Sequence, residues 1–522
     1  MLAQVMSGAV LGVEAYAVSV EVDLANGLPQ MQVVGLPHGA VREGRERVLA
    51  ALKNSGFVPP PKRITINLAP ADVPKQGSAF DLPIAIGLLA TGGVVDPERL
   101  RGICFVGELG LDGDVRPVRG VLPVALRCRA DGVRTLVVPA ANGAEAAAVR
   151  GLDVRSAERL EDVVAHLRGA RDLPRVVPDA VDLAADSAAP DLDMEDVRGH
   201  EHAKRAFEVA AAGAHNVLLV GPPGSGKSML ARRLPGILPP LSLEESLEVT
   251  KIHSVAGRLG AGQSLVRRRP FRAPHHTISD AGLVGGGNFP RPGEASLAHH
   301  GVLFLDELPE FRRSALEALR QPLEDGVTQL GRARHAVTYP ARFMLVGAMN
   351  PCPCGWFGDP LGRCTCHPGQ VERYLSRLSG PLLDRIDVHV EVPALRPEEL
   401  QSRRLGERSE RIRDRVVAAR QRQIARFRDQ PGVYANAHMG PREVRRYCRV
   451  DEAGEALLRT AITRLGLSAR AYHRVLKLAR TIADLDGSES IAAAHVAEAV
   501  QYRSLDRRQW RRAYPAGIAT EP

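Results

Sequence analysis

The sequence predicts an α/β protein with a central core built on a parallel sheet, preceded by an α+β domain and followed by a helical lid. Short, fully apolar runs at 217–220, 302–305 and 343–349 are typical of buried parallel strands, which are covered on both faces. After residue 397 the pattern is mostly helical. In the first domain, alternating patterns predict strands at 17–22, 31–34 and 64–68, with helices near 41–55 and 82–90.

Changes in composition along the 522 residues indicate where the domains begin and end. A chain of this length is expected to contain about three domains, each with its own core. The segment 171–195 is rich in Pro, Asp and Ala, which predicts a linker. The predicted divisions are an α+β domain at 1–170, the linker at 171–195, the core at 196–395, the helical lid at 396–510 and a tail at 511–522.

The composition excludes several classes of protein. Hydrophobic residues make up 44% of the chain and charged residues 25%, as in ordinary globular proteins. No apolar run approaches the roughly 20 residues that span a bilayer, so no membrane segment is expected. The N-terminus lacks the basic start of a secretory signal. These features predict a cytoplasmic protein.

Positive charge is concentrated in one part of the chain. The 69 lysines and arginines exceed the 60 acids by nine. Residues 401–450 contain 14 arginines, no lysine and 5 acids, an excess equal to that of the whole chain. Arginine grouped in this way suits phosphate backbones, and nucleic acid is the predicted partner. A solvated helix face with incomplete ion pairing is the alternative.

A glycine-rich loop of the pattern GxxxxGK[ST] follows the first apolar run and precedes a helical segment. The backbone N–H groups of such a loop and the N-terminus of its helix bind phosphate groups. Lys227 is predicted to contact the β- and γ-phosphates, Ser228 to bind Mg²⁺, and Val197 to flank adenine. The predicted nucleotide-binding residues are Val197, Gly221, Pro222, Pro223, Gly224, Ser225, Gly226, Lys227 and Ser228.

The other two apolar strands end in polar residues of the kind that nucleotide hydrolysis requires. Asp306 and Glu307 follow the strand at 302–305, and Asn350 follows the strand at 343–349. Asp306 is predicted to hold Mg²⁺ through water, Glu307 to polarise the attacking water, and Asn350 to lie between this water and the γ-phosphate. These strand ends together predict an AAA+ ATPase core that uses ATP and Mg²⁺. Surface acids after a buried strand are the alternative.

Two arginines later in the chain are candidates for contact with the γ-phosphate. Arg385 follows a helical stretch, from where it can reach the nucleotide of the next subunit. An ion pair with Asp384 or Asp387 is its alternative role. Arg470 opens a helical segment and suits a second sensor that folds from the lid onto the phosphates. Arg474, one turn later on the same face, is its competitor.

Four of the seven cysteines lie in one short segment. Two C-x-C pairs, Cys352 with Cys354 and Cys364 with Cys366, are separated by a loop rich in Gly and Pro. Thiolates arranged in this way can form a tetrahedral Zn²⁺ site, although C-x-x-C is the commoner spacing. His367 is a substitute ligand. Free buried thiols and a redox switch are the alternatives, and disulfides are not expected in a cytosolic ATPase.

Two segments interrupt the predicted core. Residues 269–279 are predicted to be a loop or hairpin extension and not a core element, and residues 328–338 a hairpin. If subunits form a ring, both segments point toward its channel, where basic residues can follow a phosphate backbone. Adjacent His275 and His276 are expected to point in different directions, which disfavours a metal site. The predicted DNA contacts are Arg272, Arg332 and Arg334.

Taken together, these stretches resemble the YifB/ComM family of magnesium-chelatase-like AAA+ ATPases over nearly the whole chain. The most specific strings are Asn-Pro-Cys-Pro-Cys-Gly at 350–355 and Arg-Pro-Phe-Arg-x-Pro-His-His at 269–276. The resemblance implies a hexameric ring, and ComM-like members are helicases that drive branch migration during recombination of incoming DNA. A magnesium-chelatase-type motor that remodels a protein partner is the alternative. The other matching stretches are 221–228, 302–307, 379–387 and 468–480.

The first domain resembles the Lon-protease type of fold, most clearly at residues 74–81. In Lon proteases a serine of this loop works with a lysine on a following helix. The comparable segment here, 118–125, contains no lysine, so no base activates the Ser78 hydroxyl. The resemblance therefore implies a non-proteolytic scaffold for assembly or DNA entry. A Lon-like protease is the second alternative.

Overall fold

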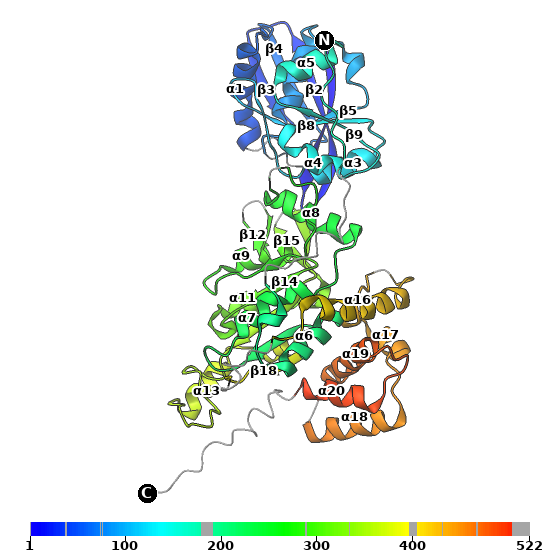
Figure 1. Cartoon of the computed structure of the whole chain (residues 1–522). Coiled ribbons are helices and arrows are strands. Elements are labelled where there is room, and N and C mark those ends of the chain that lie inside the picture. The colour runs from blue at the N-terminus through cyan, green and yellow to red at the C-terminus, as the bar shows by residue number, and fades with distance from the viewer. Residues whose placement is uncertain are drawn as a thin grey trace. The chain divides into compact units, whose positions relative to one another are not determined.

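The chain divides into two compact units in the computed structural model (Figure 1). Among the described helices, none combines the length and the apolar character that a bilayer-spanning segment needs. The first unit comprises Met1–Asp182, Leu243–Val266 and Gly331–Tyr339, and the second Leu183–Ser242, Arg267–Leu330 and Pro340–Pro522. The structure describes residues 2–36, 39–73, 75, 77–178, 192–260, 262–287, 290–332, 335–395, 405–430, 432–465 and 468–503.

A seven-stranded mixed sheet forms the centre of the first unit. In order across the sheet, its strands are β3 (Gln30–Val34), β4 (Arg63–Ala69), β2 (Glu14–Ala25), β1 (Leu2–Leu11), β5 (Ile103–Phe105), β8 (Thr135–Pro139) and β9 (Asp153–Ala157). β2 pairs antiparallel with β1 and β4, whereas the other neighbours pair parallel. Side chains at the start of β1 alternate between exposed and buried, as a strand covered on one face requires.

The helices of the first unit include two that confirm the sequence prediction, α1 (Gly39–Asn54) and α2 (Asp81–Thr91). α2 is buried along its whole length and packs on β1 and β2, which its almost uniformly apolar sequence explains. The remaining elements of this unit are α3 (Val121–Ala130), α4 (Gly143–Ala147), α5 (Leu160–Leu167), α8 (Leu243–Ala256), β6 (Glu108–Leu109) and β7 (Val115–Arg116).

Two stretches from the middle of the sequence are part of the first unit. In α8, Lys251 forms an ion pair of 3.1 Å with Glu14, and the Ser254 hydroxyl donates to the buried carboxylate of Glu145. The second stretch is Gly331–Tyr339. The residues predicted as one continuous core at 196–395 are therefore shared between the two units.

Part of the predicted linker is folded. The Val176 N–H donates to the carbonyl oxygen of Val154 at 2.9 Å, which continues the first unit beyond residue 170. Met194 is fully buried in the core of the second unit. Residues 179–191 of the linker and the tail predicted at 511–522 lie outside the described residues.

A five-stranded parallel sheet forms the centre of the second unit. In order, its strands are β11 (Phe271–Arg272), β14 (Val302–Leu305), β17 (Met344–Met349), β10 (Val217–Val220) and β18 (Val388–Glu391). Every residue of β10, β14 and β17 is buried. The prediction of three buried parallel strands is confirmed.

The prediction that residues 269–279 lie outside the core was wrong. β11 is the edge strand of the sheet, with Phe271 opposite Val302 and Arg272 opposite Leu303. The strand is only two residues long and follows a proline, so the sequence shows neither an apolar run nor an alternating pattern there.

Short helices and two hairpins surround this sheet in the sequence, and one of these hairpins includes residues 331–339 of the first unit. The hairpin predicted at 328–338 is confirmed as β15 (Val327–Arg332) and β16 (His335–Pro340), and the other pairs β12 (Gly285–Gly286) with β13 (Arg291–Pro292). The helices are α6 (Glu201–Gly213), α7 (Lys227–Arg233), α9 (Asp280–Val284), α10 (Glu294–Leu297), α11 (Arg313–Ala318), α12 (Arg320–Asp325), α13 (Pro368–Leu375) and α14 (Gly380–Leu383).

The C-terminal part of the second unit is helical (Figure 1). Its longest helices are α16 (Ser409–Arg426) and α19 (Ala469–Leu485), and both pack against α6 of the core. Ser468 caps α19 by accepting a hydrogen bond of 3.1 Å from the Ala471 N–H. The other helices here are α17 (Pro441–Tyr447), α18 (Glu452–Leu465) and α20 (Ala493–Gln501).

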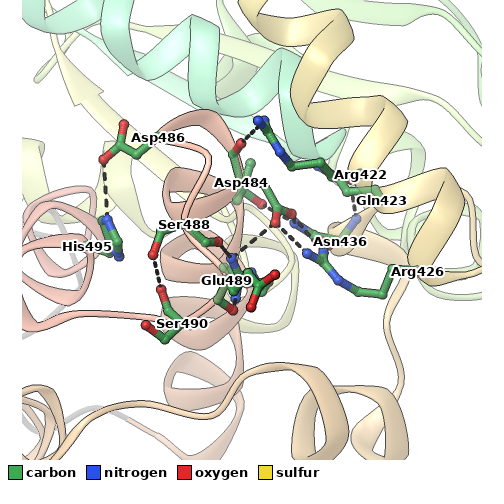
Figure 2. Close-up of polar contacts among 12 residues, drawn as sticks. Arg422, Gln423, Arg426, Asn436, Asp484, Asp486, Ser488, Glu489, Ser490 and His495 are labelled. Atoms are coloured by element: carbon green, nitrogen blue, oxygen red, sulfur yellow. Dashed lines mark hydrogen bonds and ion pairs between the residues drawn. The ribbon is translucent and has the colours of Figure 1, made fainter.

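Buried polar contacts join these helices around Asp484, which is fully buried near the end of α19 (Figure 2). Arg426 of α16 donates to both carboxylate oxygens, at 2.5 and 2.8 Å, and Asn436 donates at 2.8 Å. Arg480 adds an ion pair of 3.2 Å. Because a buried charge is costly without partners, this carboxylate is a strong constraint on how α16 packs against α19.

Asp484→Asn is expected to destabilise the second unit by about 3–5 kcal/mol, because the buried Arg480 and the partly buried Arg426 lose their counter-charge. Asp486→Asn is the matched control: this side chain is half exposed, faces His495 at 3.3 Å, and should contribute less than about 1 kcal/mol. Urea unfolding followed by circular dichroism measures both. Equal midpoints for the two variants would contradict the role given to Asp484.

Candidate nucleotide site

The loop between β10 and α7 has the backbone geometry of a phosphate-binding turn. Gly226 has a φ of +88° directly before α7, a left-handed conformation that favours glycine. At Gly221 a Cβ atom would lie 2.0 Å from the carbonyl oxygen of Val392, so only glycine fits. The buried strand β10 thus leads through a tight glycine turn to a helix N-terminus, where backbone N–H groups can meet phosphate oxygens.

Lys227, the first residue of α7, folds back over this loop. Its Nζ donates to the carbonyl oxygens of Gly221 at 2.7 Å and Pro222 at 2.8 Å. It also lies 3.3 Å from Oδ1 of Asn350 at the end of β17. Burial lowers the pKa of the Lys227 amine, and the charge of Asp306 opposes that shift. The Lys227 ammonium group therefore lies over the phosphate loop and contacts both the segment after β10 and Asn350 after β17.

Ser228 and Asp306 are brought together from α7 and the end of β14. The Ser228 hydroxyl donates to Oδ2 of Asp306 at 2.6 Å. A hydroxyl and a carboxylate are oxygen ligands of the kind that Mg²⁺ prefers. Since both oxygens lie beside the phosphate loop, their chemistry and position fit the magnesium ion expected to accompany a nucleotide.

Glu307 lies beside Asp306 in a left-handed backbone conformation, with a φ of 52°. Its N–H donates to Oδ1 of Asp306 at 3.0 Å, and its carboxylate lies 3.2 Å from Nδ1 of His276. The Glu307 side chain is 60% exposed, so it can turn toward a nucleotide. The rings of His275 and His276 are 4.1 Å apart and tilted by 33°.

Arg385 and Arg470, predicted to act on phosphate, line a common pocket with Glu324. Arg385 is buried and forms an ion pair with Glu324, and it also donates to the carbonyl oxygen of Pro381 at 2.7 Å. The hydrogen bond and charge of Arg385, together with the charge of Arg470, lower the pKa of Glu324. The partner of Arg385 is therefore Glu324; among the contacts described for Arg385, none involves the alternative Asp387.

Arg474, the competitor of Arg470, has a different partner. It forms an ion pair with Asp387, which is buried and also lies 3.3 Å from Nδ1 of His215. Burial raises the pKa of Asp387, but the charge of Arg474 and the hydrogen bond from His215 outweigh it and lower the pKa. His215 in turn contacts the Thr481 hydroxyl of α19 at 2.8 Å. Arg474 thus ties α19 to the core.

The remaining predicted residues have no described contact with Lys227, Ser228 or Asp306. Val197 is fully buried in the core. Arg272 donates twice to Glu294, at 2.6 and 2.8 Å. Arg332 is the last residue of β15, and Arg334 lies outside the described residues.

The four clustered cysteines come together directly after β17. Their sulfur atoms all lie within 4.8 Å of one another, and none of the four cysteines forms a disulfide. His367 is not among the gathered groups; it caps α13, where its backbone N–H donates to Oε1 of Gln370 at 3.0 Å.

Sequence patterns did not point to His276 as a partner of Glu307 or to Glu324 as a partner of Arg385. The position of His276 could have been predicted if β11 had been recognised, because His276 follows this edge strand and β11 lies next to β14 in the sheet. Glu324 carries none, because an acid at the end of a short helix is indistinguishable from ordinary surface charge.

Lys227→Ala is expected to weaken binding of a fluorescent ATP analogue by at least about tenfold, because the loop loses the cation that meets the phosphates. Lys251→Ala, which removes only a surface ion pair, is the control and should bind normally. Unchanged affinity in Lys227→Ala would show that the nucleotide binds elsewhere.

Three family models match this chain, and all describe parts of magnesium chelatase. "Magnesium chelatase, subunit ChlI" matches residues 193–400, which contain the phosphate loop, Asp306, Glu307, Asn350 and Arg385. "Subunit ChlI of Mg-chelatase" matches residues 20–142, and "Magnesium chelatase, subunit ChlI C-terminal" matches residues 406–503.

Known proteins resemble the chain along almost its entire length. YifB of Salmonella typhimurium is 47% identical over 507 residues, which cover 97% of this chain and 98% of that protein. Competence protein ComM of Haemophilus influenzae is 46% identical over 509 residues, again 97% and 98%. The magnesium-chelatase 67 kDa subunit of Chlorobaculum parvum is 31% identical over 160 residues, 30% of this chain and 23% of that subunit. The chain therefore belongs to the YifB/ComM family of magnesium-chelatase-like proteins.

Proposed function

We propose that this protein is an ATP-hydrolysing AAA+ motor that acts on DNA, as a hexameric helicase that promotes branch migration in homologous recombination. The observation that carries the ATPase part is the convergence of Lys227, Ser228, Asp306 and Asn350 at one edge of a parallel sheet. The DNA part is supported by the similarity to a protein named for competence.

Each residue of the site has a distinct task in this proposal. The phosphate loop and Lys227 bind the triphosphate, while Ser228 and Asp306 hold Mg²⁺, which neutralises charge on the phosphates. Glu307 turns from His276 to accept a proton from the attacking water, and Asn350 orients that water. ATP and Mg²⁺ are thus the expected ligands, with Val197 near the adenine.

Arg385 acts on the nucleotide of a neighbouring subunit, and Arg470 acts as a second sensor that folds from the lid onto the phosphates. The pocket that both arginines share with Glu324 supports these roles, because the Glu324 side chain is 58% exposed and a phosphate can replace it as the partner of Arg385. The γ-phosphate of the neighbour competes with Glu324 for Arg385. Hydrolysis then requires an oligomer, and the helical region at 405–503 acts as the lid that carries Arg470.

The first unit is a Lon-like, non-proteolytic scaffold. The Ser78 hydroxyl donates to the carboxylate of Glu108, and the segment 118–125 contains no lysine that could act as the base does in Lon proteases. DNA is contacted by Arg272, Arg332 and Arg334 in the channel of the ring. A magnesium-chelatase-type ATPase that remodels a protein partner is the second candidate, favoured by the names of the matching family models.

Arg385→Ala is expected to bind ATP normally but to hydrolyse it about 10³-fold more slowly, because the charge on the γ-phosphate loses a partner. Mixing Arg385→Ala subunits with Lys227→Ala subunits should restore turnover. In such mixed rings, the intact phosphate loop of an Arg385→Ala subunit can lie next to the intact Arg385 of a Lys227→Ala subunit. Steady-state phosphate release measures both effects.

Arg377→Ala is the control for this experiment, since Arg377 is half exposed and pairs with Glu310 on the surface at 2.8 Å. Its turnover should be normal. If Arg385→Ala is slow but the mixture remains as slow as its components, Arg385 acts within its own subunit and the shared site is wrong.

Single-stranded or branched DNA is expected to stimulate ATP hydrolysis, with binding that weakens as salt rises. Combined Arg332→Ala and Arg334→Ala changes should lower the slope of log affinity against log salt by about 2. Combined Arg312→Ala and Arg313→Ala changes, at two exposed arginines, serve as the control. Absence of both stimulation and salt-sensitive binding would favour the protein-remodelling alternative.

A further inference from the structure

The sulfur atoms of the cysteine cluster have the spacing of a tetrahedral metal site. Cys352 and Cys354 are 3.3 Å apart, Cys354 and Cys364 are 3.6 Å apart, and Cys352 and Cys364 are 3.8 Å apart. Four thiolates placed at about 2.3 Å around a tetrahedral Zn²⁺ ion lie about 3.8 Å from one another. Sulfurs joined in a disulfide would be about 2.05 Å apart.

Backbone N–H groups surround these sulfurs as they do in thiolate metal sites. The sulfur of Cys354 accepts hydrogen bonds from the backbone of Trp356 and Thr365, and that of Cys352 from the backbone of Phe357. Such donors stabilise negative charge on sulfur and orient metal ligands. Four neighbouring sulfur atoms that accept hydrogen bonds from N–H groups are better explained as thiolates around a metal cation than as neutral thiols.

The loop between the two C-x-C pairs is closed by its own contacts. Arg363 donates to both carboxylate oxygens of Asp359, at 2.7 and 2.9 Å, and its guanidinium lies 3.6 Å from the centre of the Trp356 ring. These contacts hold the loop as a hairpin whose two ends bring the cysteine pairs together. The site therefore requires no residue from another part of the chain.

The cluster is joined directly to the nucleotide site. Gly355 has a φ of +84°, and a Cβ atom there would lie 2.4 Å from Cδ of Pro223 in the phosphate loop. Asn350 lies two residues before Cys352, and its backbone hydrogen-bonds Tyr374 on α13, the helix that follows the cluster. In the sequence, the cluster therefore lies between Asn350 and α13, which contacts Asn350 through Tyr374. Its Gly355 packs against Pro223 of the phosphate loop.

We propose that Cys352, Cys354, Cys364 and Cys366 bind one Zn²⁺ ion, and that this ion holds Asn350 and the phosphate loop in the geometry that ATP hydrolysis requires. The ion is structural, because four protein thiolates fill its coordination sphere and leave no position for water or substrate. Its role does not depend on whether the motor acts on DNA or on a protein.

Metal analysis of the full-length protein tests the site without any activity assay. Protein purified from zinc-supplemented medium should contain about one zinc ion per chain, and Cys364→Ser should contain less than about a tenth of that. Cys448→Ala removes a buried cysteine outside the cluster and should keep its zinc. Zinc-free wild-type protein, or equal zinc in Cys364→Ser, would overturn the proposal.

Cobalt and mass spectrometry separate this site from the other roles for the cysteines. Co²⁺ added after chelation should give the charge-transfer bands of tetrahedral cobalt bound by thiolates, which free thiols scattered in a fold do not produce. Loss of about 2 Da per bond on oxidation in air, with no metal bound before it, would instead identify a redox switch and reject the zinc site.

Hydrogen exchange tests the link to the nucleotide site. Removing zinc by chelation should speed amide exchange at residues 350–355 and 221–226 by about tenfold or more, and Zn²⁺ alone should reverse this. Exchange in α2 of the first unit should not change, which excludes general unfolding. If zinc is bound but its removal leaves both segments unaffected, the bracing role is wrong.

Discussion

The parallel register of β10, β14 and β17 is the constraint on which the nucleotide site depends. Val217 lies opposite Val346, and Phe304 lies opposite that same residue on the other side of β17. Since the three strands run in the same direction, their carboxyl ends finish at one edge of the sheet. The hydroxyl of Ser228 reaches Asp306 only because of this alignment. A slip by one residue would turn each side chain to the opposite face.

Each charged group that acts on ATP in the proposed mechanism is held by a protein group that phosphate or water can replace. Lys227 is bound by loop carbonyls, Glu307 by His276, and Arg385 by Glu324. Partly buried charges need such partners, because removing them from water is costly. In the proposed mechanism, the exchange of one partner for another links nucleotide binding to three different segments of the chain. Such coupling is what a motor requires, since it converts a local ion-pair change into displacement of loops.

A feature of the fold or of the site could be predicted from the sequence when the residues that form it are neighbours in the chain. The phosphate loop, the acids after β14 and Asn350 after β17 could be predicted, because apolar runs and strand ends are neighbours in the chain. β11 was missed because two residues carry no periodicity. The Glu324 pairing and the inclusion of α8 in the first unit depend on partners far away in the sequence, and helical periodicity indicates a buried face without indicating what covers it.

The arginine-rich stretch at 401–450 illustrates how a charge count can mislead. Part of its charge is paired within the protein: Arg415 pairs with Glu208 and Glu407, and Arg426 pairs with the buried Asp484. Arg420 and Arg422 donate to backbone carbonyl oxygens. These arginines bind α16 to α6 and α19, so they are not available to contact a phosphate backbone without loss of that packing. Other arginines of the stretch are exposed, among them Arg411, Arg442 and Arg445, so the count overstates the charge that is free to contact a phosphate backbone without removing it.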